Sequence, residues 1–412
     1  MRTACEERQD RAGIEVCPDV HWVGVLDHDI VTFDVVMTTE HGTTYNAYLI
    51  NADKKVLVDA VKADFFDVYV EKIRQVIDPA LIDYIVFNHT EPDHSGCLDR
   101  LLELAPNATV VASRLGIGYL REFLGRDFPH QVVKGGDTLD LGNKTLQFVA
   151  APHLHWPDTM YTYLREDGLL FSCDSFGCHY AHAAMLDDRV GDFSEAFQYY
   201  FDVILKPFSR FMLKAIEQVR GLDVRGILPG HGPLLMSDWR KWVDLTEVHA
   251  RRALQYPYQD YVFVPYVSAH HNTEAMARAI AEGLGSAGEF QVQVADIETM
   301  ALGEMEEHMA RCQAVVVGCP TINQNILLPV YKLFAVINPV RDKGKLCGAF
   351  GSYGWSGEAA RIIPSSLEQL KLKMQGEGVF VRFAPDEDAL AACREYGRSM
   401  GLKLKEARRQ AA

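Results

Sequence analysis

Residues 83–96 read DYIVFNHTEPDHSG, an apolar segment that runs directly into a polar loop. Alternate residues that leave the end of a strand point the same way, so His89, Glu91 and Asp93 are expected to converge on one pocket, with His94 in a neighbouring position. A plain polar loop that begins a helix would explain any one of these residues. The combination of all four in a single loop instead indicates a metal site.

Further residues of metal-ligand type follow apolar runs in the same half of the chain: His155 in HLHWPD, Asp174 in LFSCDSFG and His231 in LPGHGP. Each alone is typical of a turn or a helix cap. Their order resembles the metallo-β-lactamase superfamily, whose two-metal site is built from H-x-H-x-D-H and then a His, an Asp and a His. Here Glu91 replaces the second histidine. A site with Glu91, Asp93 and a bridging Asp174 is rich in hard oxygen donors, which favours iron over zinc.

The 412-residue chain changes its pattern between its two halves. Short β-type runs between turns fill Trp22–Leu254 and predict mixed α/β layers, which the superfamily resemblance specifies as an αββα sandwich. In the second half, five apolar strands alternate with helices, which is typical of a doubly wound, flavodoxin-like parallel sheet. We predict domains over residues 1–254 and 260–412, joined by a linker at Arg252–Asp260. The predicted strands are 44–50, 55–59, 84–88, 109–112, 145–150, 169–173, 261–267, 290–295, 314–318, 346–351 and 379–383, and the predicted long helices of the first half are 194–219 and 238–254.

Three loops of the second half follow predicted strands at the carboxyl edge of the sheet. The first, SAHHNT at 268–273, leads into a helix, where hydroxyl groups and backbone N–H groups can hold a phosphate. The second loop is PTIN at 320–323. In the third loop, SYGWSG at 352–357, Tyr353 and Trp355 could flank a planar ring. A phosphate site and a ring site at one edge indicate flavin mononucleotide (FMN). The predicted FMN contacts are Ser268, His270, His271, Asn272, Thr273, Pro320, Thr321, Ile322, Asn323, Ser352, Tyr353, Gly354, Trp355, Ser356 and Gly357.

The composition disfavours several classes of protein. Lys and Arg total 41 against 56 Asp and Glu, and the net charge of -15 repels nucleic acid and anionic lipid. The nine cysteines include no C-x-x-C pair, which is unlike a disulfide framework or a zinc knuckle. No apolar leader and no membrane-length apolar run occur. We therefore expect a soluble cytoplasmic protein with neither a nucleic-acid nor a membrane partner.

The two halves together resemble the flavodiiron proteins, or A-type flavoproteins, which join a lactamase-like di-iron domain to a flavodoxin-like FMN domain. The resemblance covers nearly the whole chain. It rests on HTEPDHSG at 89–96, LHWPDTM at 154–160, LFSCDSFG at 170–177, PTIN at 320–323 and GSYGWSGEA at 351–359. The sequences around His231 and in the 268–273 loop depart from the commoner family forms without removing a ligand side chain.

The resemblance implies a role for each candidate ligand. His89, Glu91 and His155 would bind one iron, Asp93 and His231 would bind the other, and Asp174 would bridge them. In this family the histidine at the position of His94 is either a ligand or displaced by water.

The resemblance also implies an activity in which FMN supplies electrons to two irons that reduce dioxygen to water or nitric oxide to nitrous oxide. Electrons would come from a separate donor such as rubredoxin or a flavin or deazaflavin reductase. A head-to-tail homodimer, or a dimer of dimers, would place each flavin beside the irons of the partner.

Two other functions remain open at this point. The first is a dizinc lactamase-like hydrolase with an accessory flavodoxin-like domain, and the second is an electron-carrying flavoprotein with a vestigial metal site. Asp158 is expected to accept an N–H from one of the metal-binding histidines, without an indication of which one. Cys173 and Cys178 are interpreted as packing residues, and His153, His179 and His182 as supporting or surface histidines. The three histidines could also donate protons or hydrogen-bond the substrate.

Overall fold

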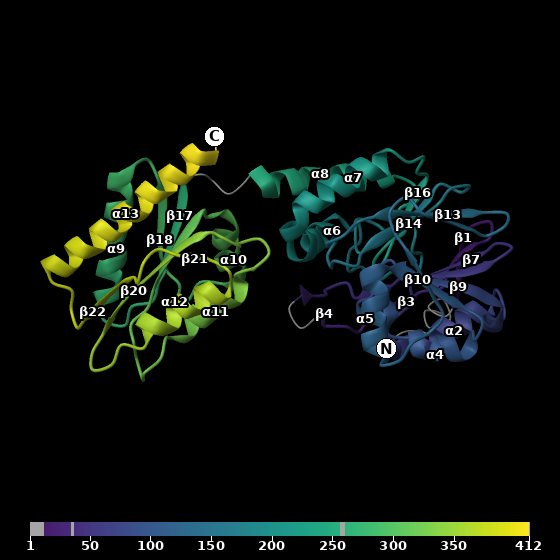
Figure 1. Ribbon diagram of the computed structural model, residues 1–412, viewed down its shortest axis with the longest axis horizontal. Helices are drawn as coiled ribbons and strands as arrows, with labels where there is room; N and C mark the ends of the chain where they lie inside the picture. Colours follow the sequence, from purple (N-terminus) through teal and green to yellow (C-terminus); the bar gives the residue numbers. More distant parts are fainter. Residues whose placement is uncertain (1–11, 34–36, 256–259, 412) are drawn as a thin grey trace. The chain divides into compact units, whose positions relative to one another are not determined.

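The computed structural model describes residues 12–33, 37–255 and 260–411. The chain divides into two compact units, unit 1 (Met1–Ala253) and unit 2 (Leu254–Ala412) (Figure 1). Within the predicted linker, residues 256–259 lie outside the described residues. Its first part is helical instead, because helix α8 (Trp239–Gln255) continues until shortly before Pro257, a residue that ends helices.

Unit 1 contains two large β-sheets. Both are mixed, with parallel and antiparallel neighbours. The seven-stranded sheet has the order β1 (Ile14–Cys17), β2 (Val20–Trp22), β7 (Tyr48–Asn51), β8 (Lys55–Val58), β9 (Ile82–Val86), β10 (Thr109–Ser113) and β11 (His130–Val133). The five-stranded sheet has the order β12 (Thr138–Asp140), β13 (Thr145–Ala150), β14 (Met160–Leu164), β15 (Leu169–Cys173) and β16 (Gly226–Pro229).

Two apolar clusters hold these layers together. One lies between the sheets, where Val58 and Val86 of the first sheet belong to the same buried cluster as Phe148 and Phe171 of the second. The other packs the outer faces of the sheets against the helices. The predicted αββα sandwich is therefore confirmed. Its helical segments are α2 (Phe66–Arg74), α3 (Pro92–Ser95), α4 (Leu98–Leu104), α5 (Arg114–Leu124), α6 (Ser194–Tyr200), α7 (Ser209–Arg220) and α8, with short turns at Ala63–Phe65 and Pro79–Leu81.

Two predicted elements of unit 1 are wrong in detail. The single strand expected at 44–50 is two strands in different sheets, β6 (Thr43–Tyr45), which pairs with β3 (Val25–Asp27), and β7. The helix expected at 194–219 is interrupted between α6 and α7 by a π-helical segment and a 3-10 turn, Phe201–Leu205 and Lys206–Phe208. Pro207 lies in that turn and cannot donate the backbone N–H that a continuous helix needs.

Unit 2 is built on one parallel sheet. Its order is β18 (Gln291–Asp296), β17 (Tyr261–Tyr266), β19 (Ala314–Gly318), β20 (Leu346–Tyr353), with β21 (Lys373–Met374) and β22 (Val379–Arg382) pairing successive parts of β20. This is the flavodoxin-like order, and the doubly wound prediction is confirmed. The five predicted strands are present. The sequence did not predict β21, because two residues are too few to show an alternating pattern.

Helices cover both faces of this sheet. On one face α9 (Asn272–Ala287) and α13 (Glu387–Ala411) contribute Met276 and Cys393 to one buried cluster. On the other face α10 (Leu302–Arg311), α11 (Leu328–Val336) and α12 (Ala359–Gln369) contribute Met305, Leu333 and Ile363 to another. The carboxyl ends of β17, β19 and β20 stay uncovered by these helices, which leaves the edge free for loops.

The contact between α9 and α13 depends on glycine. A Cβ at Gly283 would lie 1.9 Å from the carbonyl oxygen of Arg394, whereas a Cβ at Gly285, in the same helix, would meet nothing within 4 Å. We predict that Gly283→Ala destabilises unit 2 by about 2 kcal/mol or more, because two backbones must separate. Gly285→Ala should instead stabilise it by about 0.5–1 kcal/mol, because alanine favours the helix.

Differential scanning calorimetry of the full chain measures both effects. The thermal transition of unit 1 serves as the internal reference, since neither substitution touches it. Equal effects of the two substitutions on unit 2 would contradict the close α9–α13 contact.

Candidate metal centre and flavin site

The predicted metal ligands come from four separate places in unit 1. His89 follows β9, and Glu91 caps the short helix α3, which carries Asp93 and His94. His155 lies between β13 and β14, Asp174 follows β15 directly, and His231 follows β16. The structure brings all seven side chains into one cluster. Their sequence separations, from His89 to His231, mean that only the packed sandwich can assemble it.

The cluster has two halves that share one carboxylate. In the first half, His89 Nε2 and His155 Nε2 lie 3.2 and 3.0 Å from Glu91 Oε2. The same two nitrogens lie 3.6 and 3.7 Å from Asp174 Oδ2. Donor atoms of His89, His155 and Asp174 lie within 4.8 Å of one another, a spacing that suits a metal ion, and Glu91 adjoins them.

In the second half, His231 Nε2 lies 3.2 Å from Asp93 Oδ2 and 3.5 Å from Asp174 Oδ1. His94 Nε2 lies 3.5 Å from Asp93 Oδ2 and 3.2 Å from Asp174 Oδ1. Asp174 therefore presents one oxygen to each half. His94 is as close to the shared carboxylate as the other histidines are.

Unpaired polar atoms show that the cluster fits cations. Three buried carboxylate oxygens receive no hydrogen bond from the described residues. They are Oδ1 and Oδ2 of Asp93 and Oδ2 of Asp174. Burying an ionised carboxylate without a partner is costly. Two cations between the histidines and carboxylates would remove that cost.

The electrostatics of the cluster also favour metal binding. Burial opposes ionisation of Glu91, but His155 and His89 outweigh it and lower the pKa of this carboxyl to about 2. Burial likewise opposes a charge on His231, but the facing carboxylates of Asp174 and Asp93 raise the pKa of its imidazole to about 10. The carboxylates are therefore held ionised beside the imidazoles, which is the arrangement that binds a cation.

Hydrogen bonds fix the orientation of two imidazoles. His89 Nδ1 lies 3.2 Å from Asp158 Oδ2, which also accepts hydrogen bonds from the N–H and hydroxyl of Thr90. His231 Nδ1 donates to the carbonyl oxygen of Thr44 at 2.6 Å. Both bonds leave Nε2 free to face the cluster. Asp158 thus serves His89, the assignment that the sequence left open.

Three supporting residues were missed in the sequence. Asn46 donates from Nδ2 to the carbonyl oxygens of Pro229 and Gly232, both at 2.9 Å, and so holds the loop that carries His231. Tyr200 donates from its hydroxyl to Asp174 Oδ1 at 3.1 Å. The third is Thr44, whose carbonyl oxygen accepts the hydrogen bond from His231. No local sequence pattern predicts any of these three contacts.

The remaining histidines and cysteines near the cluster differ in how buried they are and in how close they lie to the ligands. His153 packs against Phe211, and His182 is exposed, as expected. His179 is buried with its ring 5.1 Å from that of His231, and burial and His231 hold its pKa well below the usual value. Cys178 is buried. Cys173 is also buried, but it lies closer to the cluster than a packing role predicts, with its sulfur within 4.8 Å of donor atoms of His94 and Asp174.

The predicted FMN contacts surround a cavity of about 410 Å³ at the carboxyl edge of the unit 2 sheet. All of them line it except His271 and Gly357, and two lining residues, Ala269 and Phe383, were not predicted. The His271 side chain is 88% exposed and pairs with Glu274. Its backbone has φ +60°, a left-handed conformation that glycine adopts more easily, which is the physical reason a glycine is common there.

The cavity suits a phosphate at one end and a ring at the other. The hydroxyls of Thr273 and Ser352 lie 3.4 Å apart beside the N-terminus of α9, and Ser268 Oγ accepts the N–H of Glu274 at 3.3 Å. Helix N-termini and hydroxyls are favourable for phosphate. Trp355 is 75% exposed at the rim, where it can cover a ring.

The fold and the two sites define a class of protein, a lactamase-like unit with a two-metal cluster followed by a flavodoxin-like unit. Residues 43–232 match the family described as ODP family beta lactamase, and residues 264–397 match the family Flavodoxin. The chain is 40% identical to the flavo-diiron protein FprA2 of Clostridium acetobutylicum, over 95% of this chain and 99% of that protein. It is 35% identical to the nitric oxide reductase of Moorella thermoacetica, over 95% and 98% of the two chains.

Among solved structures, the chain is similar to the rubredoxin oxygen:oxidoreductase of Desulfovibrio gigas, with a TM-score of 0.70, 31% identity and coverage of 96% and 99% of the two chains. The chain belongs to the flavodiiron proteins, as the sequence predicted. Family membership implies FMN and a di-iron centre. The cavity of unit 2 fits FMN, and the cluster of histidines and carboxylates in unit 1 fits two irons. Within residues 12–33, 37–255 and 260–411, no helix has the length and apolar character needed to cross a membrane.

The hydrogen bond from His89 to Asp158 gives a test of the metal centre. We predict that Asp158→Ala weakens iron binding about 10- to 100-fold, because His89 loses the partner that orients it. Asp158→Asn should recover much of the affinity, since an amide oxygen can still accept the N–H. Iron retention during competition with a chelator measures the effect, with the exposed Asp223→Ala as control. Unchanged retention in Asp158→Ala would contradict the orienting role.

Proposed function

We propose that this flavodiiron protein is a reductase of dioxygen, of nitric oxide, or of both, which forms water or nitrous oxide. The observation that carries this proposal is the shared carboxylate of Asp174, with one oxygen facing each half of the histidine cluster. When bound, the two irons would supply electrons together to one gas molecule, or to two nitric oxide molecules, held between them.

The proposed ligands divide between the two irons in the same way as the side chains divide between the two halves of the cluster. His89, Glu91 and His155 would hold one iron, Asp93, His94 and His231 would hold the other, and Asp174 would bind both. Three carboxylates in this set supply the hard oxygen donors that iron favours. Glu91 and the flavin cavity disfavour the dizinc hydrolase, and the intact donor set disfavours a vestigial metal site.

The protein controls access to the cluster from one side. The side chains of Glu91 and His155 are 16% and 17% exposed, whereas those of His89, His94 and Asp174 are at most 3% exposed. A small gas would therefore enter beside Glu91 and His155. The Tyr200 hydroxyl donates a hydrogen bond to the buried shared carboxylate and holds it in place.

In the flavin site, we propose that Ser268, Thr273 and Ser352 hold the phosphate, while Tyr353 and Trp355 flank the ring. Electrons would come from a separate donor, such as rubredoxin or a flavin or deazaflavin reductase. We also propose a head-to-tail homodimer, or a dimer of dimers, since electron transfer needs the flavin close to the irons. The described cysteines form no disulfide, in keeping with a reducing cytoplasm.

Rapid mixing tests the proposed activity. The protein with both cofactors is reduced without oxygen and mixed separately with dioxygen and nitric oxide, while flavin absorbance reports reoxidation. We predict fast reoxidation by at least one gas. Asp174→Ala should slow it by about 100-fold or more while FMN stays bound, because the two sites lie in separate units.

Asp174→Ala also serves as the control, because any reoxidation that remains in it measures the slow direct reaction of reduced flavin with the gas. Metal analysis of each preparation accompanies the kinetics. Full turnover by an iron-free Asp174→Ala protein would contradict the proposal, as would a wild-type protein that holds two zinc ions and does not react with either gas.

A further inference from the structure

The walls of the flavin cavity consist almost entirely of uncharged residues. Hydroxyl, amide and aromatic side chains line it, and the lining residues that the structure describes include no Asp, Glu, Lys or Arg. His270 is the one lining residue that can become a cation. Apart from His270, the formal charges nearest the cavity therefore belong to residues behind its lining.

An acidic and a basic residue directly adjoin lining residues along the chain. Glu274 follows Thr273, and its carboxylate lies 2.7 Å from Arg278 and 2.8 Å from His271, so that its charge is compensated. Arg382 precedes Phe383. Within the described parts of the chain, no carboxylate lies within salt-bridge distance of Arg382. Arg382 therefore contributes a positive charge that no neighbouring carboxylate compensates.

Three contacts hold Arg382 behind one wall of the cavity. Arg382 is the last residue of β22 and pairs in register with Tyr353 of β20. Its Nε donates a hydrogen bond to the carbonyl oxygen of Gly354 at 3.1 Å, and its guanidinium lies 5.5 Å from the centre of the Phe383 ring. Tyr353, Gly354 and Phe383 all line the cavity. The charge is thus separated from the cavity by a single layer of residues.

A positive charge in this place acts on the redox state of a bound flavin. Two electrons from the donor and one proton from water convert the neutral oxidised ring into a reduced ring that carries one negative charge. A nearby cation stabilises the reduced ring more than the oxidised ring, and so raises the reduction potential. The net charge of -15 on the whole chain acts in the opposite direction.

We propose that Arg382 raises the reduction potential of the bound flavin through its charge, while its hydrogen bond to Gly354 positions the loop at 352–357. Arg382 is a positioning residue and not a catalytic one, because it does not line the cavity. This inference rests on the flavin site proposed above. It does not depend on which gas the protein reduces.

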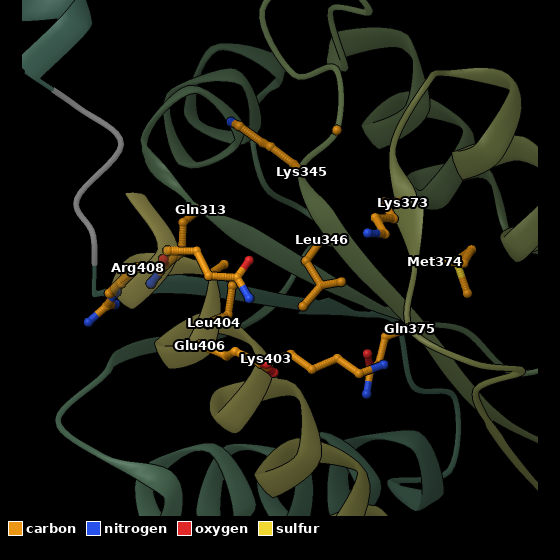
Figure 2. Close-up of a pocket in the computed structure, with 13 residues that line it drawn as sticks. Gln313, Lys345, Leu346, Lys373, Met374, Gln375, Lys403, Leu404, Glu406 and Arg408 are labelled. Atoms are coloured by element: carbon orange, nitrogen blue, oxygen red, sulfur yellow. The ribbon is translucent and has the colours of Figure 1, made fainter. Parts of the chain in front are cut away.

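Lys373 provides a matched control at the opposite edge of the same sheet. It lies in β21, which pairs with Leu346 at the start of β20, whereas Arg382 pairs with the end of β20. Lys373 lines a separate cavity of about 770 Å³ there, which shares no lining residue with the flavin cavity (Figure 2). Both side chains are exposed, so that replacing either with glutamine removes one positive charge and leaves the buried core intact.

Spectroelectrochemical titration of the full, FMN-saturated chain without oxygen tests the proposal, with flavin absorbance as the signal. Arg382→Gln keeps an N–H donor for Gly354 but loses the charge. We expect its flavin potential to fall by about 15–30 mV, which corresponds to an about three- to tenfold change in the ratio of affinities for reduced and oxidised FMN. The fall should shrink at high salt, since the charge is exposed to screening. Arg382→Lys should restore most of the potential, and Lys373→Gln should leave it unchanged.

Binding of oxidised and of reduced FMN to the flavin-free chain supplies the second readout. Arg382→Gln should weaken the binding of reduced FMN more than that of oxidised FMN. The proposal is overturned if both forms are weakened equally, if the potential falls no further than in Lys373→Gln, or if Arg382→Lys lowers it as far as Arg382→Gln does. Neither readout uses a gas, so that failure to reduce dioxygen or nitric oxide would leave this inference standing. A chain that does not bind FMN at all would contradict both the flavin site and the role of Arg382.

Discussion

The carboxylate of Asp174 faces His89 and His155 with one oxygen and His94 and His231 with the other. This shared group fixes the position of every other ligand, because each half of the cluster must lie within reach of its own oxygen. The consequence extends to the fold. The ligands follow strands of both sheets of unit 1, so that the cluster forms only when the two sheets pack face to face over their common apolar core.

Much of this arrangement could be predicted because a metal ligand at the end of a strand directly follows an apolar run in the sequence. The loop after β9 places His89, Glu91 and Asp93 in one short segment, and the later ligands each follow an apolar run. Glu91, in place of a histidine, adds a hard oxygen donor and so predicted that the site prefers iron. By contrast, Asn46, Tyr200 and the Thr44 carbonyl act on the cluster from distant points of the chain, and only the packed fold brings them there.

The same distinction applies to unit 2. The order of strands and the three loops at their carboxyl edge followed from the alternation of strands and helices. The left-handed backbone of His271 and the two-residue strand β21 did not, since each is decided by a few local contacts rather than by a repeating pattern.

The central claim is that Asp174 joins two iron ions. Anomalous X-ray diffraction from crystals of the purified protein, collected on either side of the iron absorption edge, tests it most directly. The account predicts two iron peaks per chain, one beside His89, Glu91 and His155 and one beside Asp93 and His231, with Asp174 in contact with both. A single peak, or two peaks that persist below the iron edge and belong to another metal, would contradict it.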